Sequence, residues 1–157
     1  FPNMNAGLKA IAKSFRLNVV VAVHPRSNCD QIQKCFAFPV VQNKTFELIE
    51  NASLVVAHGS SSIQMSIIHR KPVILITTDE LESSLSTETY KQFRRDLNKS
   101  VINIDHSLDN IDWSREAIVD DDVYDNYFKR YIKQRGSPEK LVWEIVIDSV
   151  ELDILAD

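Results

Sequence analysis

The sequence predicts an α/β fold: a Rossmann-like parallel sheet flanked by helices on both faces. Three short apolar runs, NVVVAV, SLVVA and PVILI, are rich in β-branched residues, as is typical of strands buried on both faces of such a sheet. Stretches with helical spacing lie between these runs, and this alternation indicates parallel β-α-β units. The 157 residues, 44% of them hydrophobic, can form one domain with its own core, so we expect a single domain over residues 1–157.

The first predicted elements are a helix over residues 5–16 and a strand over residues 18–23. Leu8, Ile11 and Phe15 recur at helical spacing in the first segment. The strand is expected to be buried on both faces. It ends at His24, because the following proline cannot continue a strand ladder.

The next elements are short. Residues 30–34 predict a short helix, and residues 36–41 predict an edge strand or a loop because Pro39 lacks an N–H group. Residues 45–52 predict another short helix with a polar cap at its start.

The centre of the chain predicts the rest of the sheet. We expect buried strands over residues 53–57 and 72–76, with a helix over residues 61–70 between them. An exposed charged helix over residues 87–98 and a short strand over residues 101–104 follow.

The last third is acidic and then helical. Residues 105–122 predict an irregular segment, and residues 124–134 predict a helix rich in aromatic residues that ends by Gly136. A last helix is expected to open at Ser137 as its cap, with Pro138 at the first helical position.

The composition excludes several functional classes. A net charge of −4 gives no basic surface for nucleic acid, so no nucleic-acid partner is expected. No apolar run reaches the ~18 residues that a membrane span needs. Cys29 and Cys35 are expected to be reduced thiols of a cytosolic protein, and no further Cys or Cys/His pair completes a metal site. Because the chain begins at Phe1, we interpret it as a piece of a longer protein.

The stretch HGSSS, residues 58–62, predicts a phosphate site. It lies between a predicted strand and a predicted helix, where unpaired N–H groups and a partial positive charge favour an anion. Gly59 permits a positive φ and a close approach of the backbone, and Ser60, Ser61 and Ser62 offer hydroxyl donors. One serine is also the ordinary cap of a helix, so capping alone is the structural alternative.

A second candidate loop, His24-Pro25-Arg26, ends the first strand. Ligands of parallel sheets bind beyond the carboxyl ends of the strands, so this loop and the serine loop are expected at one sheet edge. His24 is the candidate catalytic residue, because an imidazole can pair with a phosphate or protonate a leaving group. Arg26 can hold a phosphate with two N–H groups, and His58 can shape the glycine turn. A histidine that only caps its strand, and a solvated arginine, are the structural alternatives.

Three common site motifs are missing. The sequence contains no G-x-x-x-x-G-K-[ST] and no G-x-G-x-x-G, and GSSSI lacks the second glycine of a nucleophile elbow. A P-loop, a standard dinucleotide fingerprint and a serine hydrolase elbow are therefore not expected.

Two stretches resemble a known family. VVVAVHPR and FELIENASLVVAHGSSSIQMSIIHRKPVILI look like the nucleotide-binding, C-terminal half of GT-B glycosyltransferases, most closely bacterial enzymes of capsule and surface-polysaccharide assembly. Bacterial sialyltransferases and related capsule transferases carry an HP motif and a downstream pair of serines. His24-Pro25 resembles the first, and two of Ser60, Ser61 and Ser62 resemble the second. The resemblance implies that the histidine and the serines contact the phosphate of a CMP-activated sugar.

The second stretch is also similar to the donor-binding half of UDP-GlcNAc 2-epimerases. In that family a residue of the following helix often holds the ribose. The resemblance makes Gln64 and Ser66 the candidates for that contact.

The resemblance implies a donor-binding domain of an enzyme that moves a sugar from a CMP- or UDP-sugar to a polysaccharide acceptor. The nucleotide-sugar is then a substrate, and no cofactor is expected. The acceptor would bind a half that precedes this chain and normally supplies the catalytic base, so the isolated chain is expected to be inactive. The implied location is the cytoplasm, with peripheral association of the longer protein at the inner face of the membrane. A sugar-nucleotide epimerase stays open as an alternative, as does a non-catalytic α/β interaction module that binds a partner through residues 124–131.

Overall fold

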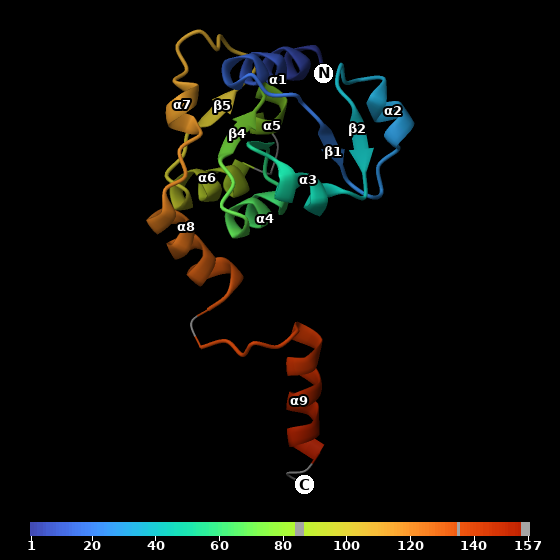
Figure 1. Ribbon diagram of the computed structural model, residues 1–157, viewed down its shortest axis with the longest axis vertical. Helices are drawn as coiled ribbons and strands as arrows, with labels where there is room; N and C mark the ends of the chain where they lie inside the picture. The colour runs from blue at the N-terminus through green and yellow to red at the C-terminus, as the bar shows by residue number, and fades with distance from the viewer. Residues whose placement is uncertain (84–86, 135, 155–157) are drawn as a thin grey trace.

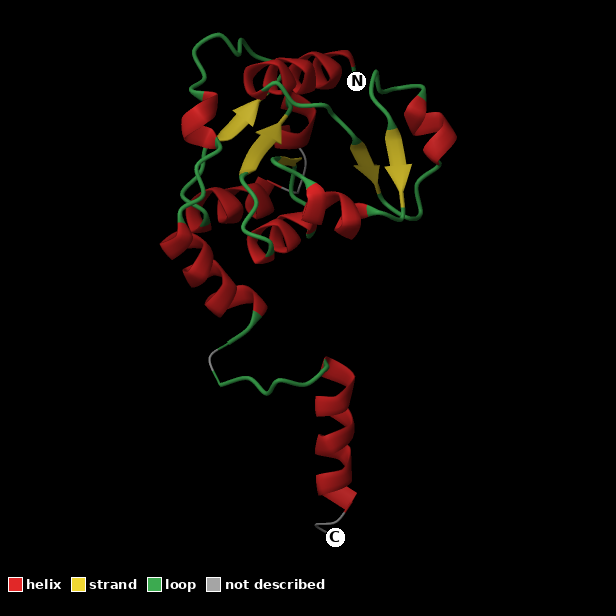
Figure 2. Cartoon of the chain, in the orientation of Figure 1, coloured by secondary structure: helices red, strands yellow, loops and turns green. Residues whose placement is uncertain are grey.

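A computed structural model of the chain describes residues 1–83, 87–134 and 136–154. It shows an α/β fold with two small parallel sheets flanked by helices (Figure 1), which confirms the predicted fold class. Figure 2 shows the strands and most of the helices in one body, with the C-terminal helix set apart from it.

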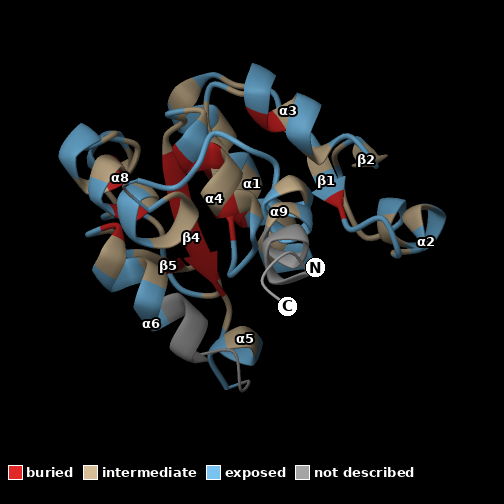
Figure 3. Ribbon diagram, turned by 90° about the horizontal axis from the view of Figure 1, so that it is seen from below, coloured by how far each residue is buried: buried red, intermediate tan, exposed pale blue. Residues whose placement is uncertain are grey.

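The main sheet has three parallel strands with β4 in the middle. Its strands are β3 (Val55–Ala57), β4 (Val73–Thr77) and β5 (Val101–Asn103). Ala57 pairs with Leu75 and Thr77 pairs with Asn103, so the carboxyl ends of the strands share one edge. Every residue of β4 is buried (Figure 3), as expected for a central strand with helices on both sides.

Helices cover both faces of this sheet. Ile11 of α1 (Pro2–Phe15) packs with Ile74 and Ile76, whereas Val73 and Leu75 belong to the core on the other face. Successive side chains of a strand point to opposite faces, so β4 contributes to both layers. The opposite face is covered by α4 (Ser62–Ile68), α6 (Thr87–Asp96) and α8 (Asp121–Tyr127).

The second sheet contains β1 (Val21–Val23) and β2 (Val40–Gln42), with α2 (Cys29–Gln33) between them and α3 (Thr45–Asn51) after them. The sequence predicted one sheet, but hydrogen bonds divide the strands into two. The arrows of β1 and β2 point downward in Figure 1, whereas those of β4 and β5 point upward. The run over residues 18–23 was expected to be buried on both faces, yet Val20 is 45% exposed and Ala22 is exposed. A strand with exposed residues gains little apolar burial from a central position in a larger sheet.

Helices join the two sheets. Gly7 of α1 lies so close to β5 that a Cβ there would be 3.0 Å from the Ile104 side chain. The Asn5 amide of the same helix donates to the Cys35 carbonyl at 2.8 Å and accepts from the Ala37 N–H at 2.9 Å. α3 contacts both β1 and α4. The two sheets are thus connected through packing and side-chain hydrogen bonds.

Two short helices follow β4 and β5. α5 (Asp79–Ser83) was not predicted, and α7 (Trp113–Glu116) lies within the acidic segment that was predicted to be irregular. The Asp112 carboxylate accepts from the Arg115 N–H at 3.1 Å and so caps α7.

The C-terminal helices begin and end differently from the prediction. The helix predicted over residues 124–134 begins at Asp121, with the Asp120 carboxylate as its cap, and continues as a π-helix, η1 (Phe128–Ile132). The last helix, α9 (Val142–Ile154), begins after the predicted Ser137 and Pro138. The Glu144 carboxylate accepts from the Leu141 N–H at 2.7 Å and provides the cap expected from the serine. None of the described helices is both long enough and apolar enough to span a membrane.

Candidate functional site

Three polar segments meet the carboxyl edge of the main sheet. They are residues 58–62 after β3, residues 78–79 after β4 and residues 104–107 after β5. This edge is where ligands bind in open parallel sheets. We therefore take these three segments as the candidate site.

The turn after β3 has the expected backbone. Gly59 has a φ of 53°, a left-handed conformation that glycine adopts without strain. Ser60 Oγ accepts from the Ser62 N–H at 3.2 Å within the turn, whereas Ser61, the cap residue of α4, makes no capping hydrogen bond with its side chain. Ser61 is exposed, and among the described residues its hydroxyl has no partner. The N–H groups of Gly59, Ser60 and Ser61 are likewise unpaired within the described part of the chain, so the turn presents donors to solvent.

His58 stands between β3 and the glycine. Partial burial of its imidazole lowers the pKa of His58 from the ordinary value of 6.5, although the residue keeps an exposed surface. The ring is therefore neutral at pH 7 and can both donate and accept a hydrogen bond. It brings no full positive charge to a ligand.

The two candidates for a ribose contact lie differently from the serines. Ser66 is fully buried, and its hydroxyl donates to the Ser62 carbonyl at 2.9 Å, so a ribose cannot reach it. Gln64 is half-buried and lies against the Tyr127 hydroxyl. Burial raises the pKa of Tyr127, and this contact with Gln64 opposes the increase. The implied ribose role is wrong for Ser66, and it stays a prediction for Gln64.

The His24 loop is held firmly, but by the second sheet. Gln42 of β2 donates from its amide to the carbonyls of Pro25 and Ser27, each at 2.8 Å. The Arg26 N–H donates to His24 Nδ1 at 3.1 Å, so the proton of a neutral His24 ring sits on Nε2. Both side chains are exposed.

The two candidate loops do not share a sheet edge. His24 follows a strand of the second sheet and Ser61 follows a strand of the main sheet. No hydrogen bond or ion pair in the described ranges joins residues 24–26 to residues 58–62. The expectation that both loops line one edge is therefore not met, because it rested on a single continuous sheet.

A polar network that the sequence analysis did not single out lies across the ends of β4 and β5. The Asp79 carboxylate accepts from the Asn103 amide at 2.8 Å and lies 3.2 Å from His106 Nε2. The Asp79 N–H donates to Asp105 at 2.8 Å, and the Asn3 amide of α1 donates to the same carboxylate, also at 2.8 Å. The Asn3 bond, followed by the Asp79 N–H, lowers the pKa of Asp105. Both aspartates are thereby fixed as acceptors, and His106 is oriented by one of them.

The sequence held a signal for this network. Residues 101–104 were predicted as a strand parallel to residues 72–76, so Asp105 and His106 had to follow the same sheet edge as Asp79. The prediction of an irregular segment over residues 105–122 left His106 without a role. The edge rule applied to β5 would have found the pair.

The site can bind an anion at the serine turn and can offer a polar contact at His106. The first property follows from the unpaired N–H and hydroxyl donors, and the second from an imidazole that the Asp79 carboxylate orients. Among the described residues, no group of three or more His, Cys, Asp or Glu side chains is arranged to hold a metal ion.

Comparisons with family models, with curated proteins and with solved structures find no match to this chain.

Proposed function

We propose that this chain binds the phosphate of a nucleotide-sugar at the serine turn, as the donor-binding domain of a glycosyltransferase that elongates or builds a polysaccharide. The observation that carries the proposal is the unpaired set of donors at residues 59–61, which lies beyond the carboxyl end of β3. Backbone N–H groups and a hydroxyl can surround a phosphate without a metal ion.

The same sheet edge supports the rest of the ligand. Neighbouring strands are about 4.8 Å apart, so the ends of β3 and β5 are separated by roughly 10 Å across β4. One extended ligand can thus touch Ser61 with its phosphate and His106 with its sugar. The acceptor would bind to another part of a longer protein, and the reaction would take place in the cytoplasm, at the membrane surface where the acceptor is membrane-bound.

Titration of the chain with CMP and with UDP tests the proposal, with amide chemical shifts as the readout. We expect saturable shifts at residues 58–62 and weaker binding in Ser61→Ala, because a lost hydrogen bond to a charged phosphate costs about 1.5–3 kcal/mol. Ser14→Ala, which removes an exposed serine of α1, is the matched control and should bind as the wild type does. A folded chain that binds neither nucleotide would disprove the proposal.

The role of His24 is tested in the same titration with the variant His24→Ala. If the two sheets close on each other around a ligand, His24→Ala weakens nucleotide binding. If they keep the observed arrangement, the variant binds as the wild type does, and the HP motif has no part in donor binding.

A further inference from the structure

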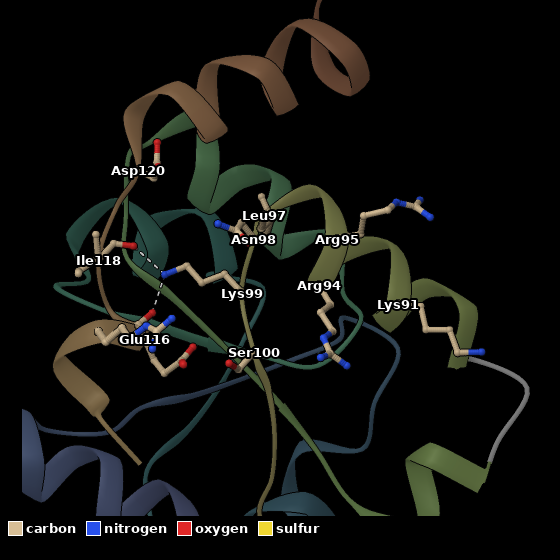
Figure 4. Close-up of a pocket in the computed structure, with 11 residues that line it drawn as sticks. Lys91, Arg94, Arg95, Leu97, Asn98, Lys99, Ser100, Glu116, Ile118 and Asp120 are labelled. Carbon is tan, nitrogen blue, oxygen red and sulfur yellow. Dashed lines mark hydrogen bonds between the residues drawn. The ribbon is translucent and has the colours of Figure 1, made fainter. Parts of the chain in front are cut away.

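An open hollow lies at the amino end of β5, beyond the opposite edge of the main sheet from the serine turn. It has a volume of about 650 Å³. Its walls are the end of α6, the segment before β5 and residues 115–120 around the end of α7 (Figure 4). We call it the basic hollow. Its charged lining consists of Lys91, Arg94, Arg95, Lys99 and Arg115, with Glu116 and Asp120.

The basic hollow is positively charged in an acidic chain. Five cationic and two anionic side chains line it, whereas the whole chain has a net charge of −4. One of the anionic groups is already used, because the Asp120 carboxylate accepts from the Val123 N–H as the cap of α8. A local surplus of positive charge raises the concentration of anions at the surface.

Two of the cations have a structural role. Lys99 Nζ donates to the carbonyls of Glu116 and Ile118 at 2.5 and 2.6 Å. It thus provides a hydrogen-bond partner for backbone carbonyls at and just after the end of α7. Arg95 lies 3.3 Å from the Asp96 carboxylate and extends away from Lys99 in Figure 4. Neither residue needs a ligand to explain its position.

Arg94 and Arg115 lack such a role. Both are exposed, and neither forms an ion pair or a side-chain hydrogen bond with any described residue. Each lies in the last turn of its helix, where the helix dipole accounts for about 0.3–1 kcal/mol. The dipole does not explain why two unpaired guanidinium groups from different helices line one hollow. In Figure 4 Arg94 extends from α6 on the side of Ser100 and Glu116.

We propose that the basic hollow binds a small anion made of linked phosphates. A guanidinium group donates two parallel N–H bonds to a phosphate, so two arginines on different walls suit adjacent phosphates. Lys91 lies one turn before Arg94 on α6, about 4.5 Å along the helix axis, and extends the row of positive charge. The linked phosphates belong either to inorganic tripolyphosphate or to a nucleoside triphosphate.

The experiment titrates the whole chain with sodium tripolyphosphate, and separately with UTP, at low ionic strength. We expect saturable binding of tripolyphosphate, with amide shifts centred on residues 94–100 and 115–118. The double variant Arg94→Gln/Arg115→Gln should weaken binding at least about tenfold, the effect of losing one charge-assisted hydrogen bond. Lys9→Gln/Lys13→Gln, which removes two exposed charges from α1, is the control and should change binding less than twofold.

The arms of the experiment separate the possible outcomes. UTP that binds more tightly than tripolyphosphate at the same residues identifies a nucleotide as the source of the phosphates. Shifts confined to residues 58–62 with both probes, or equal losses in the two double variants, would overturn the proposal. The wild-type shift map needs no variant, so it decides the matter even where the arginine variant does not fold. The basic hollow and the serine turn are tested by different substitutions, so either proposal can fail alone.

Discussion

At the scale of single residues, His58 has the most informative surroundings. Partial burial lowers the pKa of this histidine in the folded chain below the 6.5 of an unfolded one. The unfolded state therefore takes up a proton first as the pH falls. The ring is neutral and its contribution to stability is complete above pH 6.5.

We expect the free energy of unfolding to decrease as the pH falls through 6.5 toward the lower pKa of folded His58. Urea unfolding between pH 5 and pH 8 measures this slope, and His58→Gln should reduce it because the variant side chain does not titrate. A ¹H titration of the His58 ring gives the pKa directly. A midpoint at or above 6.5 would contradict the expected desolvation.

The residues of the candidate site show which properties a sequence can predict. Gly59 was predicted to need a positive φ, since a strand-to-helix turn is local in sequence, and the structure confirms it. Ser66 shares one helical face with Ile63 and Ile67, so helical spacing favours its burial over the ribose contact that the resemblance implied, and the structure shows it buried. The His24 loop illustrates the limit of such local patterns, since its relation to Ser61 depends on which strands pair.

At the scale of elements, α4 connects the candidate site to the core. Ile63 and Ile67 are 0% and 2% exposed and pack with β4, directly after the serine turn. At its other end, Arg70 contacts the carboxylates of Asp121 and Asp125 on α8, and the Asp125 hydrogen bond raises the pKa of Arg70. The helix that follows the serine turn is thus held by its buried face and by a polar contact beyond its other end.

Ile63→Ala should destabilise the chain by about 2–5 kcal/mol, because it leaves a cavity beneath the serine turn. For a domain of this length, such a loss lowers the unfolding temperature by roughly 5–15 °C. Circular dichroism during heating measures the change. Ile68→Ala is the matched control: Ile68 is 48% exposed, so the same substitution five residues later in α4 should cost less than about 1 kcal/mol. Equal effects in the two variants would mean that α4 does not pack as described.

Apolar runs and helical spacing predicted most elements, and the errors arise at boundaries. The strand over residues 72–76 appears as β4, one residue later, because its whole run is apolar. The start of α9 was misplaced because the Ser137-Pro138 pair fits the local pattern of a helix start, whereas the helix begins at Val142 and the Glu144 carboxylate accepts from the Leu141 N–H. α5 was missed because its five residues carry no apolar period.

At the scale of the whole molecule, the chain divides into an α/β body and α9. Figure 1 shows α9 apart from the body, and its described apolar side chains face solvent: Val142 is 78% exposed and Trp143 is 58% exposed. The expectation of a single domain over residues 1–157 rests on length and average hydrophobicity, and it stays a prediction. Those averages cannot show that part of the apolar content lies outside the core.

Substitution of Trp143 and Val146 by glutamine should therefore leave the unfolding of the α/β body unchanged. Val146 is 53% exposed, so neither substitution removes apolar surface that folding buries. Surface changes of this kind stay within about 0.5 kcal/mol, which is roughly 2 °C in the unfolding temperature of a domain of this size. Heating the double variant beside Ile63→Ala compares loss of an exposed apolar surface with loss of a buried one. A decrease of many degrees in the double variant would show that α9 packs against the body in solution, and the division of the molecule would have to be redrawn.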